Sequence, residues 1–313
     1  MTEKNEMDIT AQVDKLGEFM RESGYLAVPL LDASHQPASI EPGQVWRARW
    51  DDALALVFID SVLGGFKNSV RVAPVTIGID DADYSAVLLP STSNSLSTAL
   101  SIWPDLVSEI AEVVLEHWVT DFTSGLTSLM AIDAAVERGE LRHGFPILNP
   151  DSPRAVEKEL LVRLMAALVR ATDVVAGTGR LPEMFTVAGV AVKLIATTLN
   201  VDNSWALKVR RGEVPVDQSQ AEALAPILNR TPGEVIEGNP AIPEGLLAAV
   251  TTVRRGPQVR SLAAVLRVPV SQAFERMTRD SFALAARGET SGPDWSARVE
   301  RYVESWLGNE RQP

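Results

Sequence analysis

The sequence predicts an α+β protein in which a small N-terminal β-barrel or curled sheet with helices precedes an all-α half. Three observations indicate this class. Between residues 41 and 89, apolar and polar side chains alternate in short runs separated by glycine or aspartate turns, as in strands. Beyond residue 150, apolar residues instead recur every three or four positions, as they do on helices. The 313 residues, 46% of them hydrophobic, suffice for two or three domains.

Several short strands that follow one another closely indicate a curled sheet or a small barrel. An amphipathic helix over 9–23 is expected to precede them. Clustered acids such as Asp51-Asp52 and Asp80-Asp81-Asp83 are assigned to turns between strands rather than to a cation site, because aspartate bonds its own backbone in tight turns. The expected strands are 42–50, 53–60, 70–77 and 84–89, with a turn at Gly64-Gly65.

Helices are expected to complete the N-terminal domain and to form the whole C-terminal half. The run 105–120 can place its apolar residues on one helical face, and a second helix over 126–138 would end at Gly139. The prolines of 149–153 make the best linker, since Ser152-Pro153 can open a helix over 154–176. The predicted domains are 1–40, 41–148, 149–240 and 241–313.

A helix-turn-helix pattern is centred on the tripeptide 200–202. An apolar-periodic run ends there, and Asp202 or Asn203 can cap the next helix, because a short polar side chain accepts hydrogen bonds from the first amides of a helix. That helix would run to Arg210, and Gly212 is expected to terminate it.

The two helices of this pattern are predicted to pack closely and to leave one face of the second helix free. Ala196 is small enough for the close approach, and Val201 would fill the corner. With Ala206 and Val209 buried, the remaining face suits the major groove of DNA. The candidate DNA-contacting residues on this helix are Asn203, Ser204, Lys208 and Arg211, with Arg210 at the edge.

Two further helices are expected, from Val216 to Asn229 and from Thr231 onward. Together the segments LNVDNSWALKVRRG and VPVDQSQAEALAPILNRTPGEVIEG resemble the Xre/Cro-type helix-turn-helix domain over about Val187–Gly238. The resemblance implies double-stranded DNA as the ligand, a homodimer, and 203–210 as the recognition helix. Trp205 and the lack of a glutamine near the start of the preceding helix depart from the family pattern. The alternative is a set of packed helices that does not bind DNA.

The window 253–279 has a local excess of five positive charges, with six arginines and one glutamate. Its segment 262–274 again resembles helix, corner and helix, with Ser271 as the expected N-cap, and is a candidate second helix-turn-helix. The alternative is a solvated arginine face on a helical hairpin. The candidate DNA contacts here are Arg254, Arg255, Arg260 and Arg276.

A second, smaller resemblance covers roughly Glu41–Leu89. The pattern PGQVWRARW, then an apolar strand, then VRVAPVT, resembles a degenerate MazF/PemK-type toxin barrel, a family that cuts RNA. Thr76 matches a functional threonine of that family. Asp51-Asp52 stands where the family has an arginine-proline pair that supplies the catalytic arginine, so the resemblance implies a binding or dimerisation domain here. A small Src-homology-like barrel fits these strands equally.

The net charge of −12 is unevenly distributed. From Met1 to Pro182 there are 26 acidic and 14 basic residues, whereas from Glu183 to Pro313 there are 15 of each. The C-terminal half can therefore approach DNA without a net negative charge. The acidic N-terminal domain is expected to bind an effector or a partner protein.

Other classes have little support in the sequence. The absence of cysteine excludes disulfides and thiolate metal sites and fits a reducing cytoplasm. His35, His117 and His143 form no metal-ligand pair, there is no phosphate-binding glycine loop, and neither a metal nor a cofactor is predicted. The polar, acidic start predicts no secretory signal, and no apolar run approaches the roughly 20 residues of a membrane span.

These observations predict a cytoplasmic, non-enzymatic, sequence-specific DNA-binding transcriptional regulator of the Xre type. One alternative is an antitoxin-like or phage-defence module that binds protein and does not contact DNA. A second alternative is a MazF-like endoribonuclease.

Overall fold

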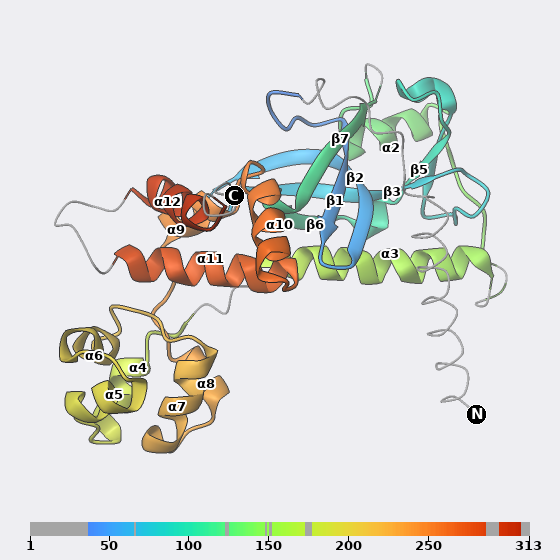
Figure 1. The fold of residues 1–313 in the computed structure, drawn as a ribbon. Helices are drawn as coiled ribbons and strands as arrows, with labels where there is room; N and C mark the ends of the chain where they lie inside the picture. Colours follow the sequence, from blue (N-terminus) through green and yellow to red (C-terminus); the bar gives the residue numbers. More distant parts are fainter. Residues whose placement is uncertain are drawn as a thin grey trace. The chain divides into compact units, whose positions relative to one another are not determined.

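The computed structural model describes residues 37–65, 67–122, 125–147, 149, 152–172, 177–285 and 294–307 (Figure 1). The chain divides into two compact units. Unit 1 contains the described residues up to Ala171 together with Thr251–Gly256, and unit 2 contains Thr172–Val250 and the part from Pro257 onward. The helix expected over 9–23 lies outside the described residues.

Unit 1 is built on a curled antiparallel sheet that forms a half-barrel. Its strands are hydrogen-bonded in the order β7-β1-β2-β3-β5-β4-β8, and β6 pairs with β3 beside this path. The predicted α+β class, with a curled N-terminal sheet and a helical C-terminal half, is therefore confirmed. The strands are β1 (Gln44–Trp50), β2 (Ala53–Gly64), β3 (Ser69–Ile77), β4 (Val87–Leu89), β5 (Leu100–Ile102), β6 (Ser108–Ala111), β7 (Leu115–Asp121) and β8 (Arg142–His143).

The first two turns of the sheet form where residues tolerate a left-handed backbone. Only Asp51 and Asp52 join β1 to β2, and Asp51 has a φ of 47°. Gly64 and Gly65, with φ of 64° and 86°, lead into the turn before β3. Aspartate visits this region more readily than most residues, and glycine has no Cβ to clash there. These turns lie where the sequence predicted them.

The helix expected over 105–120 is wrong. This stretch forms β6 and β7, joined by a short 3-10 turn at Glu112–Val114. β7 pairs with β1, and β6 pairs with β3. The apolar residues of the stretch suit a helical face, but β-branched side chains also pack well on a sheet, and the edges of β1 and β3 supply backbone partners that the local pattern does not reveal.

Two helices complete unit 1, α2 (Leu129–Glu137) and α3 (Pro153–Val169). The hydroxyl of Ser152 caps α3, and Pro153 occupies its first turn, as the serine-proline signal predicts. α3 packs against β1, β2 and β6, so it belongs with the sheet and not with the helices that follow it in sequence. It ends at Val169, before the expected end at Ala176.

A partly buried cluster of Lys158, Asp83 and Asp105 joins α3 to the sheet. The Nζ atom of Lys158 lies 3.2 Å from Oδ2 of Asp83 and 2.6 Å from Oδ2 of Asp105. Burial opposes ionisation of Asp83. Hydrogen bonds from Ser85 and the ammonium of Lys158 outweigh this effect, so that the pKa of Asp83 is lowered. Asp83 therefore holds α3 against the sheet through Lys158 and also accepts a hydrogen bond from the backbone of its own turn.

Unit 2 begins with five helices around one core. Phe185, Ile195 and Leu224 are among the residues that this core buries completely. Such burial of apolar side chains on several short helices is what stabilises them, because helices of this length are marginal alone. The helices are α4 (Leu181–Val187), α5 (Val192–Leu199), α6 (Asn203–Arg210), α7 (Gln218–Leu228) and α8 (Pro232–Glu237).

The remaining helices of the described residues are α9 (Glu244–Val250), α10 (Arg255–Leu266), α11 (Val270–Ala285) and α12 (Trp295–Leu307). α9, α11 and α12 contact one another. α12 buries an apolar stripe through Val299, Tyr302 and Val303. Within the described ranges, no single helix is long and apolar enough to cross a membrane. α4 and α5 together have the length and apolar composition of a span, but they are bent by 113° relative to each other.

Candidate nucleic-acid interface

The turn between α5 and α6 has the geometry that its residues predict. Asn200 adopts the left-handed conformation, with φ 52° and ψ 50°, and the amide of Val201 donates to the carbonyl of Ala196 at 3.0 Å. This hydrogen bond closes the end of α5. Asp202 is the N-cap of α6, since its carboxylate accepts from the amide of Trp205 at 2.8 Å. Of the two predicted caps, Asp202 has this role and Asn203 is the first helical residue.

Small side chains allow α5 and α6 to pack together. Ala196 is 8% exposed, and Ala206 and Val209 on α6 are completely buried. Val201 is partly buried and packs against the same core, which is the corner position expected for it. The helix spacing and the buried face of α6 therefore agree with the helix-turn-helix pattern.

The exit from α6 is held by a residue that the sequence analysis did not single out. Gly212 has a φ of 66° and terminates the helix as predicted. After it, the chain is clamped by Asn239, whose side-chain amide accepts from the amide of Val216 at 2.8 Å and donates to its carbonyl at 2.9 Å. Asn239 lies 23 positions away in the sequence, so no local pattern could indicate this contact.

The remaining face of α6 carries the predicted contact residues. Asn203 and Ser204 are exposed in its first turn, and Lys208 is half-buried one turn further on. Arg211 follows the helix with 62% of its side chain exposed, and its guanidinium lies 3.7 Å from the carboxylate of Glu213. The fifth residue, Arg210, is half-buried beside this face, as its edge position predicts.

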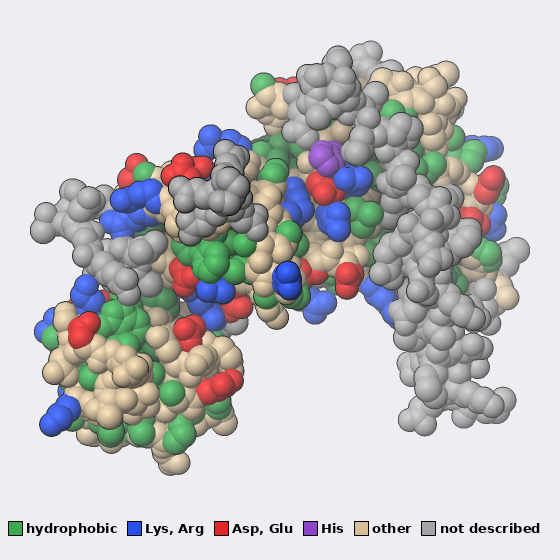
Figure 2. Space-filling model, viewed as in Figure 1, with side chains coloured by type: hydrophobic (Ala, Val, Ile, Leu, Met, Phe, Trp, Pro, Cys, Tyr) green, Lys and Arg blue, Asp and Glu red, His purple; other side chains and the backbone are tan. Residues whose placement is uncertain are grey.

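Charge is polarised within this five-helix group. From 192 to 211, which covers α5 and α6, there are four basic residues and one acidic residue. From 213 to 237, which covers α7 and α8, there are five acidic residues and one basic residue. In Figure 2, acidic side chains lie over α8, whereas both basic and acidic side chains lie beside α6. Such a dipole favours an approach to phosphates through α5 and α6.

The turn between α10 and α11 repeats this backbone geometry. Arg267 has a φ of 55°, and the amide of Val268 donates to the carbonyl of Ala263 at 3.1 Å. The prediction of Ser271 as the N-cap is wrong, because α11 already begins at Val270. The amide of Ala273 donates to the carbonyl of Pro269, the residue before the helix. The corner geometry expected for this segment is therefore present.

The candidate arginines of this second motif are largely committed elsewhere. Arg276 lies 3.6 Å from Asp280 and stacks over Trp306 at 4.9 Å. Asp280 is the first residue after the positive window 253–279. Arg255 is only 3% exposed, so its assignment as a phosphate contact is wrong, since a buried side chain cannot meet a phosphate. Arg260 is half-buried, and of the four candidates Arg254 and Arg276 are exposed.

Thr76, which matches the functional threonine of the toxin family, is buried in the sheet unit. Thr76 is 7% exposed, and its hydroxyl accepts a hydrogen bond from the indole of Trp103 at 3.2 Å. Asp51 and Asp52 form the loop after β1. Among the residues that the structure describes, no three or more His, Cys, Asp and Glu side chains group as metal ligands would.

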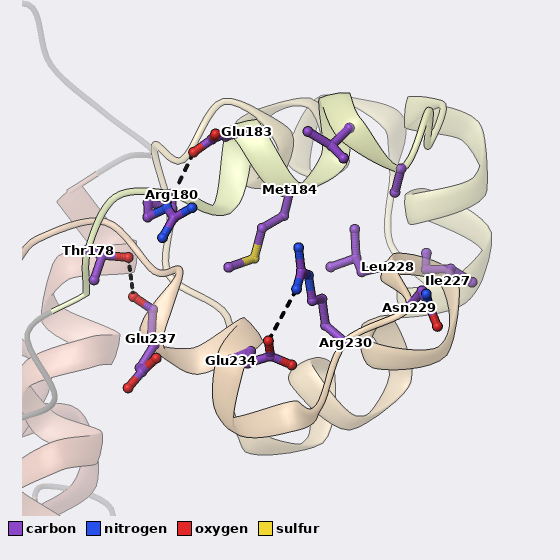
Figure 3. Close-up of a pocket in the computed structure, with 12 residues that line it drawn as sticks. Thr178, Arg180, Glu183, Met184, Ile227, Leu228, Asn229, Arg230, Glu234 and Glu237 are labelled. Carbon is purple, nitrogen blue, oxygen red and sulfur yellow. Dashed lines mark hydrogen bonds and ion pairs between the residues drawn. The ribbon is translucent and has the colours of Figure 1, made fainter.

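A cleft of about 520 Å³ lies beside the helix-turn-helix, between α4 on one side and the end of α7 with α8 on the other (Figure 3). Its apolar lining includes Met184, Val187 and Leu228, and its charged lining includes Arg180 and Arg230. No lining residue belongs to α5 or α6, so the cleft and the candidate DNA-contacting face are separate surfaces.

Comparisons with protein-family models, with curated proteins and with solved structures find no match to this chain. The function proposed below therefore depends on the geometry and charge of α5, α6 and their surroundings.

Proposed function

We propose that the protein is a sequence-specific DNA-binding transcriptional regulator that inserts α6 into the major groove. The observation that carries the proposal is the exposed first turn of α6, which the Asn200 turn and the Asp202 cap hold rigidly on the basic side of a polarised helical group. Helix-turn-helix proteins contact base edges through this part of the second helix.

The size and chemistry of α6 suit this role. An α-helix with its side chains is about 10–12 Å across, which matches the roughly 12 Å width of the major groove. The carboxamide of Asn203 has the donor and acceptor pair that matches adenine, whereas Lys208 can donate to guanine or to a phosphate. Arg211 lies just beyond the helix, where it can bind a phosphate and orient the helix.

The acidic unit 1 has a complementary role in this proposal. Its negative charge opposes non-specific attachment to DNA, which depends on phosphate neutralisation. It would bind the effector or the partner protein that controls DNA binding by unit 2. We place this regulator in the cytoplasm, and we assign it no catalytic role.

Fluorescence anisotropy with fragments from upstream of its own gene tests the proposal. The wild-type protein should bind one fragment saturably, and the logarithm of its affinity should fall linearly with the logarithm of salt concentration, by about 0.9 for each phosphate neutralised. Lys208→Ala with Arg211→Ala should weaken binding at fixed salt by about tenfold or more, because each lost charged contact costs about 1–3 kcal/mol.

Arg138→Ala is the matched control, since Arg138, like Arg211, is more than half exposed and lies beside a glutamate two positions on, but belongs to unit 1. It should leave DNA affinity unchanged. Circular dichroism must show that all variants are folded. An affinity that the folded double variant retains in full would rule out α6 as the recognition helix. No binding of wild-type protein at low salt would favour the protein-interaction alternative.

A further inference from the structure

The cleft beside α4 combines apolar and charged side chains. Met184 and Leu228 line it from opposite walls, and Ile227 lies next to Leu228 (Figure 3). Ile227 and Met184 are only partly buried by the core. These side chains leave a small apolar surface in the cleft that is partly open to solvent.

A large apolar side chain at the rim of the same cleft is almost fully exposed. Val187, in the last turn of α4, is 77% exposed, and Ala188 continues the lining. Val187 packs against little in its own unit, although valine loses free energy in water. One surface therefore offers both an apolar knob and an apolar hollow.

Charges of both signs surround this apolar centre. On the α4 wall, Arg180 lies 3.3 Å from Glu183, and on the opposite wall, Arg230 lies 3.3 Å from Glu234. Glu237 adds a third carboxylate to the lining. All four paired side chains remain substantially exposed, so each ion pair can exchange its partner at little cost.

We propose that this cleft is the contact surface between two copies of this chain related by a two-fold axis. A two-fold interface uses the same patch on both copies and must be complementary to itself. Here Val187 of one copy would enter the cleft of the other, and arginines of one copy would face glutamates of the other. An apolar centre inside a polar rim is the usual arrangement of such interfaces.

The charge pattern favours a second copy over a small ligand. An anion in the cleft would meet three carboxylates, and a cation would meet two guanidinium groups. A second copy supplies both signs at once. That such a dimer would place two α6 helices on DNA depends on the proposed function, whereas the existence of the interface does not.

The chain contains no cysteine, so a single introduced thiol can be cross-linked without background. Val187→Cys, treated with a short bis-maleimide and without DNA, should give a covalent dimer, because both thiols lie within one interface. Met130→Cys is the matched control, since Met130 is similarly exposed at 80% but belongs to unit 1. Equal cross-linking at both positions, or none at position 187, would overturn the proposal.

Sedimentation equilibrium gives a second, independent measurement. Val187→Asp should raise the dimer dissociation constant by about tenfold or more, because it would bury a carboxylate in an apolar centre. Met130→Asp should leave that constant unchanged. A wild-type protein that stays monomeric, or a folded Val187→Asp variant that dimerises as the wild type does, would refute the interface. Loss of DNA binding by a protein that still cross-links at Val187→Cys would instead refute the proposed function alone.

Discussion

The side-chain amide of Asn239 forms two hydrogen bonds with the backbone of Val216, one at 2.8 Å to its amide and one at 2.9 Å to its carbonyl. Both residues are buried, at 4% and 0% exposure. This pair joins the segment after α6 to the end of α8. It thereby stabilises the loop from which the candidate recognition helix is presented.

Asn239→Ala should lower the free energy of unfolding by about 2–3 kcal/mol, because it leaves a buried amide and a buried carbonyl without partners. Urea unfolding followed by circular dichroism measures this change. Asn203→Ala is the control, since this exposed side chain should alter stability by only about 0.5 kcal/mol or less. An unchanged unfolding midpoint for Asn239→Ala would show that the clamp contributes nothing to stability.

Asn200→Val should destabilise the protein by about 1–2 kcal/mol, because a β-branched residue is strained at the left-handed φ of 52°. Asn200→Gly should cost little, as glycine adopts this conformation without a steric clash. Thermal unfolding of the two variants in parallel separates backbone strain from loss of the asparagine side chain. Equal destabilisation by both variants would contradict the backbone explanation.

Arg276→Ala should leave DNA affinity and its salt dependence unchanged, although Arg276 is the most exposed arginine of the α11 face. Its guanidinium stacks over the ring of Trp306 at 4.9 Å, and it would have to leave the indole to reach a phosphate. The anisotropy titration with the upstream fragment checks this outcome. A smaller salt slope in the variant would instead place Arg276 on DNA.

Glu157 on α3 predicts a pH dependence of stability. Burial raises the pKa of its carboxyl group from 4.5 to about 7, and repulsion by the carboxylates of Asp81 and Asp83 adds to the shift. Between these two values the folded chain retains a proton that the unfolded chain has lost. The contribution of this group to stability is therefore present in full below pH 4.5 and decreases as the pH rises to about 7.

Glu157→Gln should remove this dependence. At about pH 8 the variant should exceed the wild type in unfolding free energy by on the order of 2 kcal/mol, a value reduced from the full linkage because the group is partly solvated. The difference should shrink toward about pH 5, where the wild-type carboxyl is protonated in the folded state. Denaturant unfolding across this range measures it, and parallel pH profiles for the two proteins would contradict the shifted pKa.

Much of the candidate site could be predicted because its signals are local. A left-handed asparagine, an aspartate cap and a terminating glycine act within a few residues of the chain, so Asn200, Asp202 and Gly212 could be assigned from neighbours alone. The hairpin at Asp51-Asp52 and the start of α3 at Ser152-Pro153 follow the same rule.

Other features depended on residues distant in the sequence. The stretch 105–120 became β6 and β7 because β1 and β3 offered free edges, although its apolar spacing also fits a helix. In the positive window over 253–279, Arg276 contacts Asp280 and Trp306, which lie outside the window. Arg255 changed from a candidate contact into a buried side chain.

The sequence by itself determined the α+β class, the turn chemistry and the helix-turn-helix spacing, because backbone preferences and helix caps act over a few neighbouring residues. Only the tertiary structure decided which strands closed the sheet, which arginines stayed exposed, and how Asn239 holds the segment after α6. These outcomes depend on which distant surfaces meet, since a buried hydrogen bond or ion pair forms only after packing has removed both groups from water.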